Sequence, residues 1–285
     1  MTLRIAFLGS RKFELQVPAE DHSGGASFFA VAEDSRPSIA NARMFGPDVT
    51  FVFDPFSFPR SELDSVPGIK VGIVSEQPTP GELNETVRRH RAGRGAFDWF
   101  TWFEEPPPQI ADLPFLAVIG AVVDTRRLPN PPALERLEVA VPTWAQPPDV
   151  SISAELLPGH SDPFKLREVL SRHGILLYYS KEPLRLSDPA LVLALGHGQL
   201  VISNQAFPVQ CGLEEEDEYL VRPVKEWPKL INKEQEGLGY FRAVRVRAWQ
   251  KVRELFDASR VFRRLASDAT MLNAPRRTSP TRPRW

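Results

Sequence analysis

The densest group of residues suited to binding a charged ligand lies in a polar loop in the second half of the chain. Lys181 and Arg185 bring positive charge into this loop. Ser187 or Asp188 can cap a helix that begins at Pro189, because the proline ring fixes φ at a helical value. A helix N-terminus offers free N–H groups and the positive end of a dipole. The loop therefore predicts a site for a phosphate or a carboxylate, although a loop without a ligand would use the same residues.

A second group of residues suits proton transfer. Asp21 and His22 lie in a polar loop after the first predicted strand, and two glycines follow at residues 24–25. The ordinary pKa of histidine suits a general base near neutral pH. We therefore take His22, with Asp21 beside it, as the candidate base, with an incidental surface histidine as the alternative. Glu76 and Asp54, which follow other strand ends, are the next candidates.

The elements around the charged loop form a βαβ unit. Residues 174–180 are a short apolar run without helical spacing, which is typical of a buried parallel strand. A helix is expected over residues 189–195, and the glycines on either side of His197 then let the chain turn back. Residues 200–203 form the next strand, so the length fits a parallel crossover.

Apolar strands alternate with short helices in the first half of the chain, which predicts a doubly wound parallel sheet. Strands are expected at residues 4–9, 27–32, 49–54, 70–75, 98–103 and 116–122, with helices at 37–45 and 81–90. Thr79 and Glu82 match a capping box for the second helix. Polar residues follow the strand ends: Ser10, Arg11, Asp54, Ser75, Glu76 and Asp124. They should share one rim, because ligands bind outside the carboxyl ends of parallel strands.

Proline-rich connections divide the chain into two parts. Prolines cluster within residues 129–148, which is typical of a linker rather than of element interiors. We therefore expect one domain over residues 1–128 and a second over residues 129–272. The tail, residues 273–285, is rich in proline and arginine and is expected to be disordered.

The second domain is expected to end in a long helix. Its earlier elements are predicted as strands at residues 137–142 and 150–156 and helices at 163–173 and 223–231. Residues 237–265 then show helical spacing of apolar residues, which gives one buried face. The spacing places four basic residues outside this face: Arg242, Arg245, Lys251 and Arg253.

Composition limits the classes of protein. The 285 residues are 42% hydrophobic, enough for a sizeable core in each of two domains. A net charge of −1 gives no overall attraction to nucleic acid or membranes. The single cysteine, Cys211, excludes an internal disulfide and a cysteine-based metal cluster. The chain has no apolar run long enough for a transmembrane helix or a signal peptide, so we expect a cytoplasmic protein.

The stretch of residues 174–204 resembles the donor-domain segment of GT-B glycosyltransferases, most closely the branch related to spore-maturation glycosyltransferases. In that branch a strand, an arginine in a short loop, a helix ending in a glycine turn and a second strand lie beside the nucleotide sugar. The counterparts here are residues 175–179, Arg185, residues 193–198 and residues 200–203. Residues 71–78 (VGIVSEQP) and 121–124 (AVVD) are similar to two further segments of the same branch.

The resemblance implies a fold, an activity and a set of ligands. The implied fold is α/β, with two Rossmann-like doubly wound domains and a C-terminal helix that crosses back to the first. The implied activity is sugar transfer from a nucleotide sugar to an unknown acceptor, without a metal or a cofactor. The residues implied at the donor are Lys181, Arg185, Ser187, Asp188, His197 and Gly198. The residues implied in catalysis are His22, Asp21 and Glu76.

The sequence departs from the retaining family-4 enzymes of this fold at two glutamates spaced eight positions apart. The aligned positions here are Arg185 and Leu193, so the retaining mechanism cannot be carried over. Glu182 or Asp188 is a candidate to take one of the two roles. Three hypotheses therefore stand: an active glycosyltransferase, a catalytically inert GT-B-like module that binds a nucleotide sugar or a protein, and a doubly wound protein of another kind.

Overall fold

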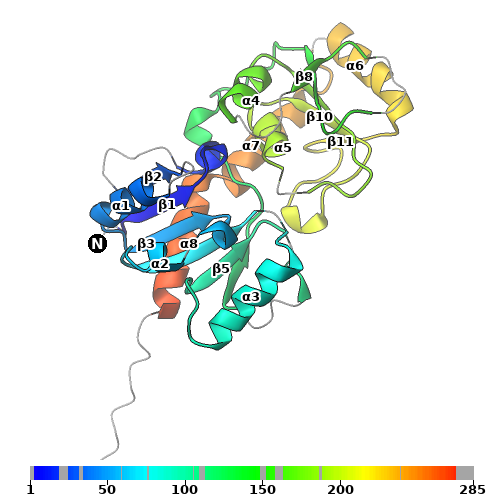
Figure 1. Cartoon of the computed structure of the whole chain (residues 1–285). Coiled ribbons are helices and arrows are strands. Elements are labelled where there is room, and N and C mark those ends of the chain that lie inside the picture. Colours follow the sequence, from blue (N-terminus) through cyan, green and yellow to red (C-terminus); the bar gives the residue numbers. More distant parts are fainter. Residues whose placement is uncertain are drawn as a thin grey trace, which may run out of the picture.

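The chain forms two parallel β-sheets, one of six strands and one of five, each flanked by helices. The computed structural model describes residues 3–18, 25–31, 35–58, 60–75, 77–104, 106–108, 113–147, 152–157, 163–185, 188–237 and 239–273. In Figure 1 the first sheet lies in the blue to cyan part of the molecule and the second in the green to yellow part. The last helix, drawn in orange-red, returns to the first sheet.

The first sheet has the order β2-β1-β3-β4-β5-β6, with every neighbouring pair parallel. Its strands are β1 (Ile5–Gly9), β2 (Ala26–Ala30), β3 (Val49–Phe53), β4 (Ile69–Val74), β5 (Trp99–Trp102) and β6 (Phe115–Val118). Its helices are α1 (Arg36–Phe45), α2 (Arg60–Leu63) and α3 (Pro80–Arg91), and a 3-10 turn, η1 (Arg11–Gln16), follows β1. All six predicted strands are present, and the last ends earlier than predicted.

The predicted capping box of α3 is confirmed. The Thr79 hydroxyl accepts a hydrogen bond from the Glu82 backbone N–H at 3.3 Å, and the Glu82 carboxylate accepts one from the Thr79 N–H at 2.9 Å. These two bonds satisfy backbone donors that a helix start otherwise leaves unpaired. The start of this helix can therefore be predicted from neighbouring residues in the sequence.

The second sheet has the order β11-β10-β9-β7-β8 and is also parallel throughout. Its strands are β7 (Val139–Pro142), β8 (Glu155–Leu157), β9 (Ile175–Tyr178), β10 (Leu200–Ser203) and β11 (Leu220–Val221). Its helices are α4 (Pro163–Leu170), α5 (Pro189–Gly196) and α6 (Trp227–Glu236). Gly174 is required before β9, because a Cβ there would lie 1.7 Å from the Arg136 carbonyl oxygen.

The prediction of one helix over residues 237–265 is wrong, because two helices occupy this region. They are α7 (Arg242–Leu255) and α8 (Ala258–Asn273). Between them the chain pairs with Val123, which accepts from the Ala258 N–H and donates to the Phe256 carbonyl, both at 2.9 Å. Asp257 then caps α8 by accepting from the Arg260 N–H at 2.9 Å. The break depends on a contact with a distant segment, so apolar spacing alone does not show it.

Helix α8 crosses back to the first sheet, as predicted. Its buried residues, Phe262 among them, belong to the same apolar cluster as Phe7 and Phe51. Helix α7 packs against α5 in the second domain, so the two C-terminal helices join both halves of the molecule. The chain therefore consists of two Rossmann-like domains with a crossing helix. Among the described residues, no helix is long and apolar enough to cross a membrane.

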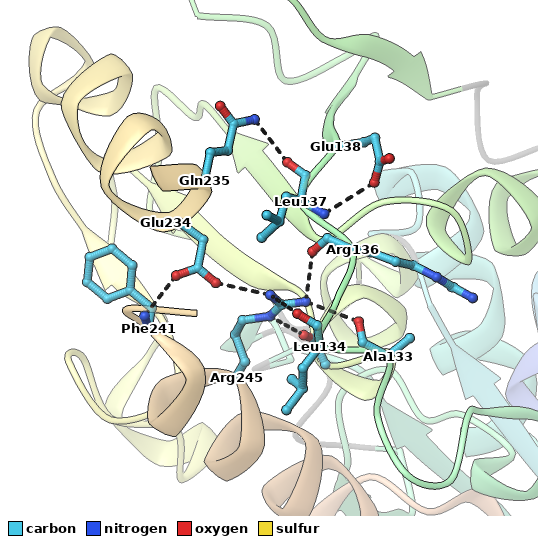
Figure 2. Close-up of polar contacts among 10 residues, drawn as sticks. Ala133, Leu134, Arg136, Leu137, Glu138, Glu234, Gln235, Phe241 and Arg245 are labelled. Carbon is cyan, nitrogen blue, oxygen red and sulfur yellow. Dashed lines mark hydrogen bonds and ion pairs between the residues drawn. The ribbon is translucent and has the colours of Figure 1, made fainter. Parts of the chain in front are cut away.

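The predicted exposure of Arg245 is wrong, because its side chain is 1% exposed. Its guanidinium lies 3.0 Å from the Glu234 carboxylate and donates to the carbonyls of Gly198 at 2.7 Å and Leu134 at 3.0 Å. Further bonds reach the carbonyls of Ala133 and Arg136, both at 3.2 Å. Figure 2 shows how these contacts fasten α6 and α7 to residues 133–136. The predicted burial of Val244, Ala248 and Val252 on the same helix is confirmed.

Candidate functional site

The strand order places one topological switch point in each sheet. In the first sheet the direction in which successive strands are added reverses between β1 and β3, and in the second it reverses between β7 and β9. Doubly wound sheets bind ligands at the carboxyl ends of the strands beside such a point. A cavity of about 360 Å³ is lined by residues that follow β1 and β4 in the first domain and β7 and β9 in the second. The two switch points therefore face one cavity.

Two residues that line the wall from the first domain, Lys12 and Ser75, both contact the carboxylate of Asp54. Lys12, in the 3-10 turn after β1, lies 3.1 Å from the Asp54 carboxylate, and the Ser75 hydroxyl donates to the other Asp54 oxygen at 2.8 Å. Asp54 follows β3 with φ 52°, in the left-handed region that a non-glycine residue seldom adopts. The predicted rim therefore exists at Asp54 and Ser75, and Lys12 is a member that the sequence analysis missed.

Gln16 adds a polar group to the same wall. Its side chain is 5% exposed and lines the cavity, and its amide oxygen has no hydrogen-bond partner in the described part of the chain. A buried acceptor left unpaired costs free energy, about 1–3 kcal/mol, so such a group suits contact with a ligand donor.

The other predicted rim residues lie elsewhere. Asp124 is fully buried in the connection to the second domain, where its carboxylate pairs with Arg126 at 2.9 Å and Arg127 at 3.4 Å. Arg11 places its guanidinium 5.2 Å from the ring centre of Phe164 on α4, which links the two domains. These residues hold the connection together and do not line the cavity.

The wall from the second domain is built around Asp188. Its carboxylate caps α5 by accepting from the Ala190 N–H at 2.8 Å, and it also accepts from the Trp144 indole at 3.1 Å and from the Tyr178 hydroxyl. Burial and the neighbouring Asp188 charge raise the pKa of Tyr178, so this phenol stays protonated. The prediction that Asp188 can cap the helix is confirmed, and its carboxylate takes the place beside the helix N-terminus that was predicted for a bound anion.

Arg185 is the cation that the second domain presents to the cavity. Its guanidinium pairs with Glu182 at 2.7 Å, and its side chain is 57% exposed. The hydrogen bond to Glu182 and the charge of Glu104 raise the pKa of Arg185. Lys181, in the same loop, is exposed and does not line the cavity. Ser187 lies outside the described residues.

His197 and Gly198, which were predicted to contact the donor, do not line the interdomain cavity. They follow the C-terminal end of α5 and precede β10, whereas the cavity is at the carboxyl ends of the strands. The His197 ring is 4% exposed and its Nδ1 lies 2.8 Å from the Leu193 carbonyl. Gly198 has φ 76°, and a Cβ there would lie 2.5 Å from Pro132. Gly198 is thus a turn residue.

The predicted catalytic residues Asp21, His22 and Glu76 lie outside the described residues. Ser75, which directly precedes Glu76, lines the cavity. The sequence analysis also missed Trp144, which follows β7 after a single residue and donates into the cavity wall. A polar aromatic residue just after a buried strand is the signal that would have found it.

Comparison with known proteins gives structural neighbours. No protein-family model and no curated protein matches the chain. The structure of HepE from Anabaena in complex with UDP matches with a TM-score of 0.56 at 13% identity, over 94% of this chain and 100% of that one. An alpha-glucosyltransferase in complex with UDP-glucose and DNA matches with a TM-score of 0.53 at 12% identity, over 94% and 99%.

A glycosyltransferase from Rickettsia africae matches over 96% of this chain and 100% of its own, with a TM-score of 0.53 at 9% identity. These matches extend over both domains. The chain has the GT-B fold. At such identities the likeness concerns the arrangement of the two domains and not the residues of a site.

Proposed function

We propose that this chain is a glycosyltransferase that moves a sugar from a nucleotide-sugar donor to an acceptor, without a metal ion, in the cavity between its domains. The observation that carries the proposal is the single cavity shared by two facing switch points, which is where doubly wound domains bind ligands. The neighbouring structures of HepE hold UDP and UDP-glucose, which supports a nucleotide sugar as donor.

Two cations in the cavity suit a nucleotide-sugar donor, whose leaving group is a nucleoside diphosphate. Arg185 and Lys12 line opposite walls, and a positive charge beside the departing phosphate stabilises the transition state. Arg185 is half exposed, so its guanidinium can leave the Glu182 carboxylate and bind a phosphate oxygen while the loop stays folded. The unpaired amide oxygen of Gln16 is the proposed acceptor for a hydroxyl or N–H group of the donor.

The acceptor must lose a proton, and His22, assisted by Asp21, is the proposed base, with Glu76 as the next candidate. A glycan, a protein, a small molecule and a nucleic acid all carry hydroxyl groups that such a site can use. The alpha-glucosyltransferase neighbour is bound to DNA as well as to UDP-glucose, so nucleic acid belongs among the acceptors to test.

One observation favours the alternative of a binding module without catalysis. The Asp188 carboxylate, which lines the cavity, is held by Trp144 and the α5 N-terminus. The Asp54 carboxylate is held by two lining residues, Lys12 and Ser75. Neither is placed as a free base in the structure. The alternative module would bind a nucleotide sugar and leave it intact.

A thermal-shift screen of nucleotide sugars, followed by a hydrolysis assay on those that bind, separates the hypotheses. Both proposals predict a higher melting temperature with UDP or another nucleoside diphosphate, because a ligand that binds the folded state stabilises it. The glycosyltransferase alone predicts release of the diphosphate or transfer of the sugar. Absence of any stabilisation at millimolar ligand would reject both.

A further inference from the structure

A second cavity, of about 530 Å³, lies at the edge of the second sheet opposite the interdomain cavity. Its lining comes from the connection between the domains, from the segment before β7, from α4 and from the C-terminal end of α5. The polar residues that matter here are Arg127, Arg136, Arg167 and His197. The proposed sugar transfer uses none of them.

The lining of this cavity is strongly positive. It includes three arginines and one glutamate, Glu168, which leaves a formal charge of +2 with His197 neutral. Arg127 shares the buried Asp124 carboxylate with Arg126, and Glu168 pairs with Arg172 at 3.6 Å. The guanidinium groups of Arg136 and Arg167 form no hydrogen bond or ion pair with any described residue. All three arginines are half-buried, so their mutual repulsion is less screened than at an open surface.

The backbone around Arg136 is fixed, which holds this charge in place. The Arg245 guanidinium donates to the Arg136 carbonyl at 3.2 Å, and Gly174 allows the same carbonyl to approach β9. Figure 2 shows the Arg136 side chain running away from the Glu234–Arg245 pair, so it does not join that buried ion pair. Arg136 lines the second cavity instead.

His197 places an ionisable ring in the wall of the cavity. Its Nδ1 is held by the Leu193 carbonyl at 2.8 Å, so the ring position is fixed and the second ring nitrogen is the one left for a ligand. Burial is the main cause that lowers the pKa of His197 to about 4. The hydrogen bond to Leu193 raises this pKa, and the charges of Arg167 and Arg136 lower it further. Both arginines line the same cavity as His197.

The negative C-terminal ends of nearby helices do not neutralise the positive charge of the cavity lining. Helices α4 and α5 both end near the cavity, and the C-terminal end of a helix carries a partial charge of roughly −0.5 that favours cations. Two such ends amount to about one negative charge. The net charge of the lining side chains is +2, so an excess of positive charge remains.

We infer that this second cavity is a binding site for a small phosphorylated molecule, whose phosphate is held by Arg136, Arg167 and Arg127. A phosphate dianion matches the charge of the lining, and the planar guanidinium fork matches phosphate oxygens. The cavity volume lies in the range of small-molecule sites, about 300–1,000 Å³, so it has room for the rest of the molecule against Phe164 and Leu128. This inference does not depend on the proposed sugar transfer.

The test is calorimetric titration of inorganic phosphate into the full chain, in a chloride buffer at constant ionic strength. Wild type is expected to bind phosphate, and the Arg136→Gln/Arg167→Gln double variant to bind it roughly tenfold or more weakly, since hydrogen bonds to charged groups are lost. Arg88→Gln/Arg89→Gln is the matched control, because both arginines lie on α3 of the first domain, are 76% and 53% exposed and do not line this cavity.

A second readout needs no variant of the arginines. Phosphate should raise the pKa of His197, which proton NMR can follow in wild type, with the resonance assigned by its absence in His197→Gln. Equal affinity in the double variant and in the Arg88→Gln/Arg89→Gln control, or no movement of the His197 resonance at saturating phosphate, would overturn the inference. Failure of wild type to bind phosphate at millimolar concentration would overturn it as well.

Discussion

At the scale of single residues, Arg185 and Arg88 make a matched pair. Each is an exposed arginine paired with a glutamate three residues earlier, but only Arg185 lines the interdomain cavity. We expect Arg185→Ala to weaken UDP binding by about 1–3 kcal/mol, the range for hydrogen bonds to charged groups, without lowering the melting temperature. Calorimetry checks this, with Arg88→Ala as control. Unchanged affinity in Arg185→Ala would remove Arg185 from the proposed donor site.

His22 is the residue on which the proposed acid–base chemistry depends. If it is the base, His22→Ala should lower the transfer rate by about 10²-fold or more and leave UDP affinity almost intact, because a base acts in the transition state rather than in donor binding. Single-turnover kinetics with the donor found by the screen would measure this. Turnover comparable to wild type would direct attention to Glu76 or Asp54.

His197 predicts a dependence of stability on pH. Its pKa is about 4 in the folded protein, against an ordinary histidine value of 6.5 in the unfolded chain, so the unfolded chain binds more protons between these values. The contribution of His197 to stability is fully present above pH 6.5 and is lost as the pH falls toward 4, by about 3 kcal/mol. Urea midpoints measured across this range should fall less steeply in His197→Gln. Identical slopes in the two proteins would contradict the assignment.

At the scale of elements, the Glu234–Arg245 pair joins α6, α7 and the segment before β7. Burial lowers the pKa of Arg245, and the bond to Glu234 opposes that effect. We expect Glu234→Ala to destabilise the protein by about 3–5 kcal/mol, because it leaves a buried guanidinium without its counter-charge. Urea unfolding measures the loss.

Two further variants test whether the loss of stability in Glu234→Ala comes from the broken ion pair. Glu236→Ala, an exposed residue on the same helix, should change stability by no more than about 0.5 kcal/mol. The double variant Glu234→Leu/Arg245→Met should recover part of the loss, because it removes both charges together. If Glu234→Ala were as stable as Glu236→Ala, the pair would not be what holds the two helices to the segment.

At the scale of the whole molecule, the first domain depends on the last helix of the chain. Phe262 of α8 is fully buried, with its ring centre 4.9 Å from that of Phe7 and 5.0 Å from that of Phe51. We expect Phe262→Ala to lower the free energy of unfolding by about 3–5 kcal/mol, through lost burial and the cavity left behind. Met271→Ala on the same helix, where Met271 is 66% exposed, should have little effect. Equal stability of the two variants would mean that α8 is not part of the first domain's core.

The sequence by itself determined the features that depend on neighbouring residues. Alternation of apolar strands with short helices predicted the doubly wound sheet of the first domain, and Thr79 with Glu82 and Asp188 before Pro189 marked two helix starts that the structure confirms. Such signals are local, because a cap or a periodic pattern involves residues within one or two turns. The resemblance of residues 174–204 to GT-B donor domains led to the fold that the structural neighbours share.

Only the tertiary structure decided which distant residues meet. Lys12 and Trp144 belong to one cavity because two sheets bring their carboxyl ends together, and no spacing along the chain encodes that meeting. Arg245 is buried because carbonyls more than a hundred residues away, those of Ala133 and Leu134, accept from it. The break before α8 likewise depends on Val123. Exposure, pairing and helix breaks of this kind are set by what packs against a residue, and that is a property of the folded chain.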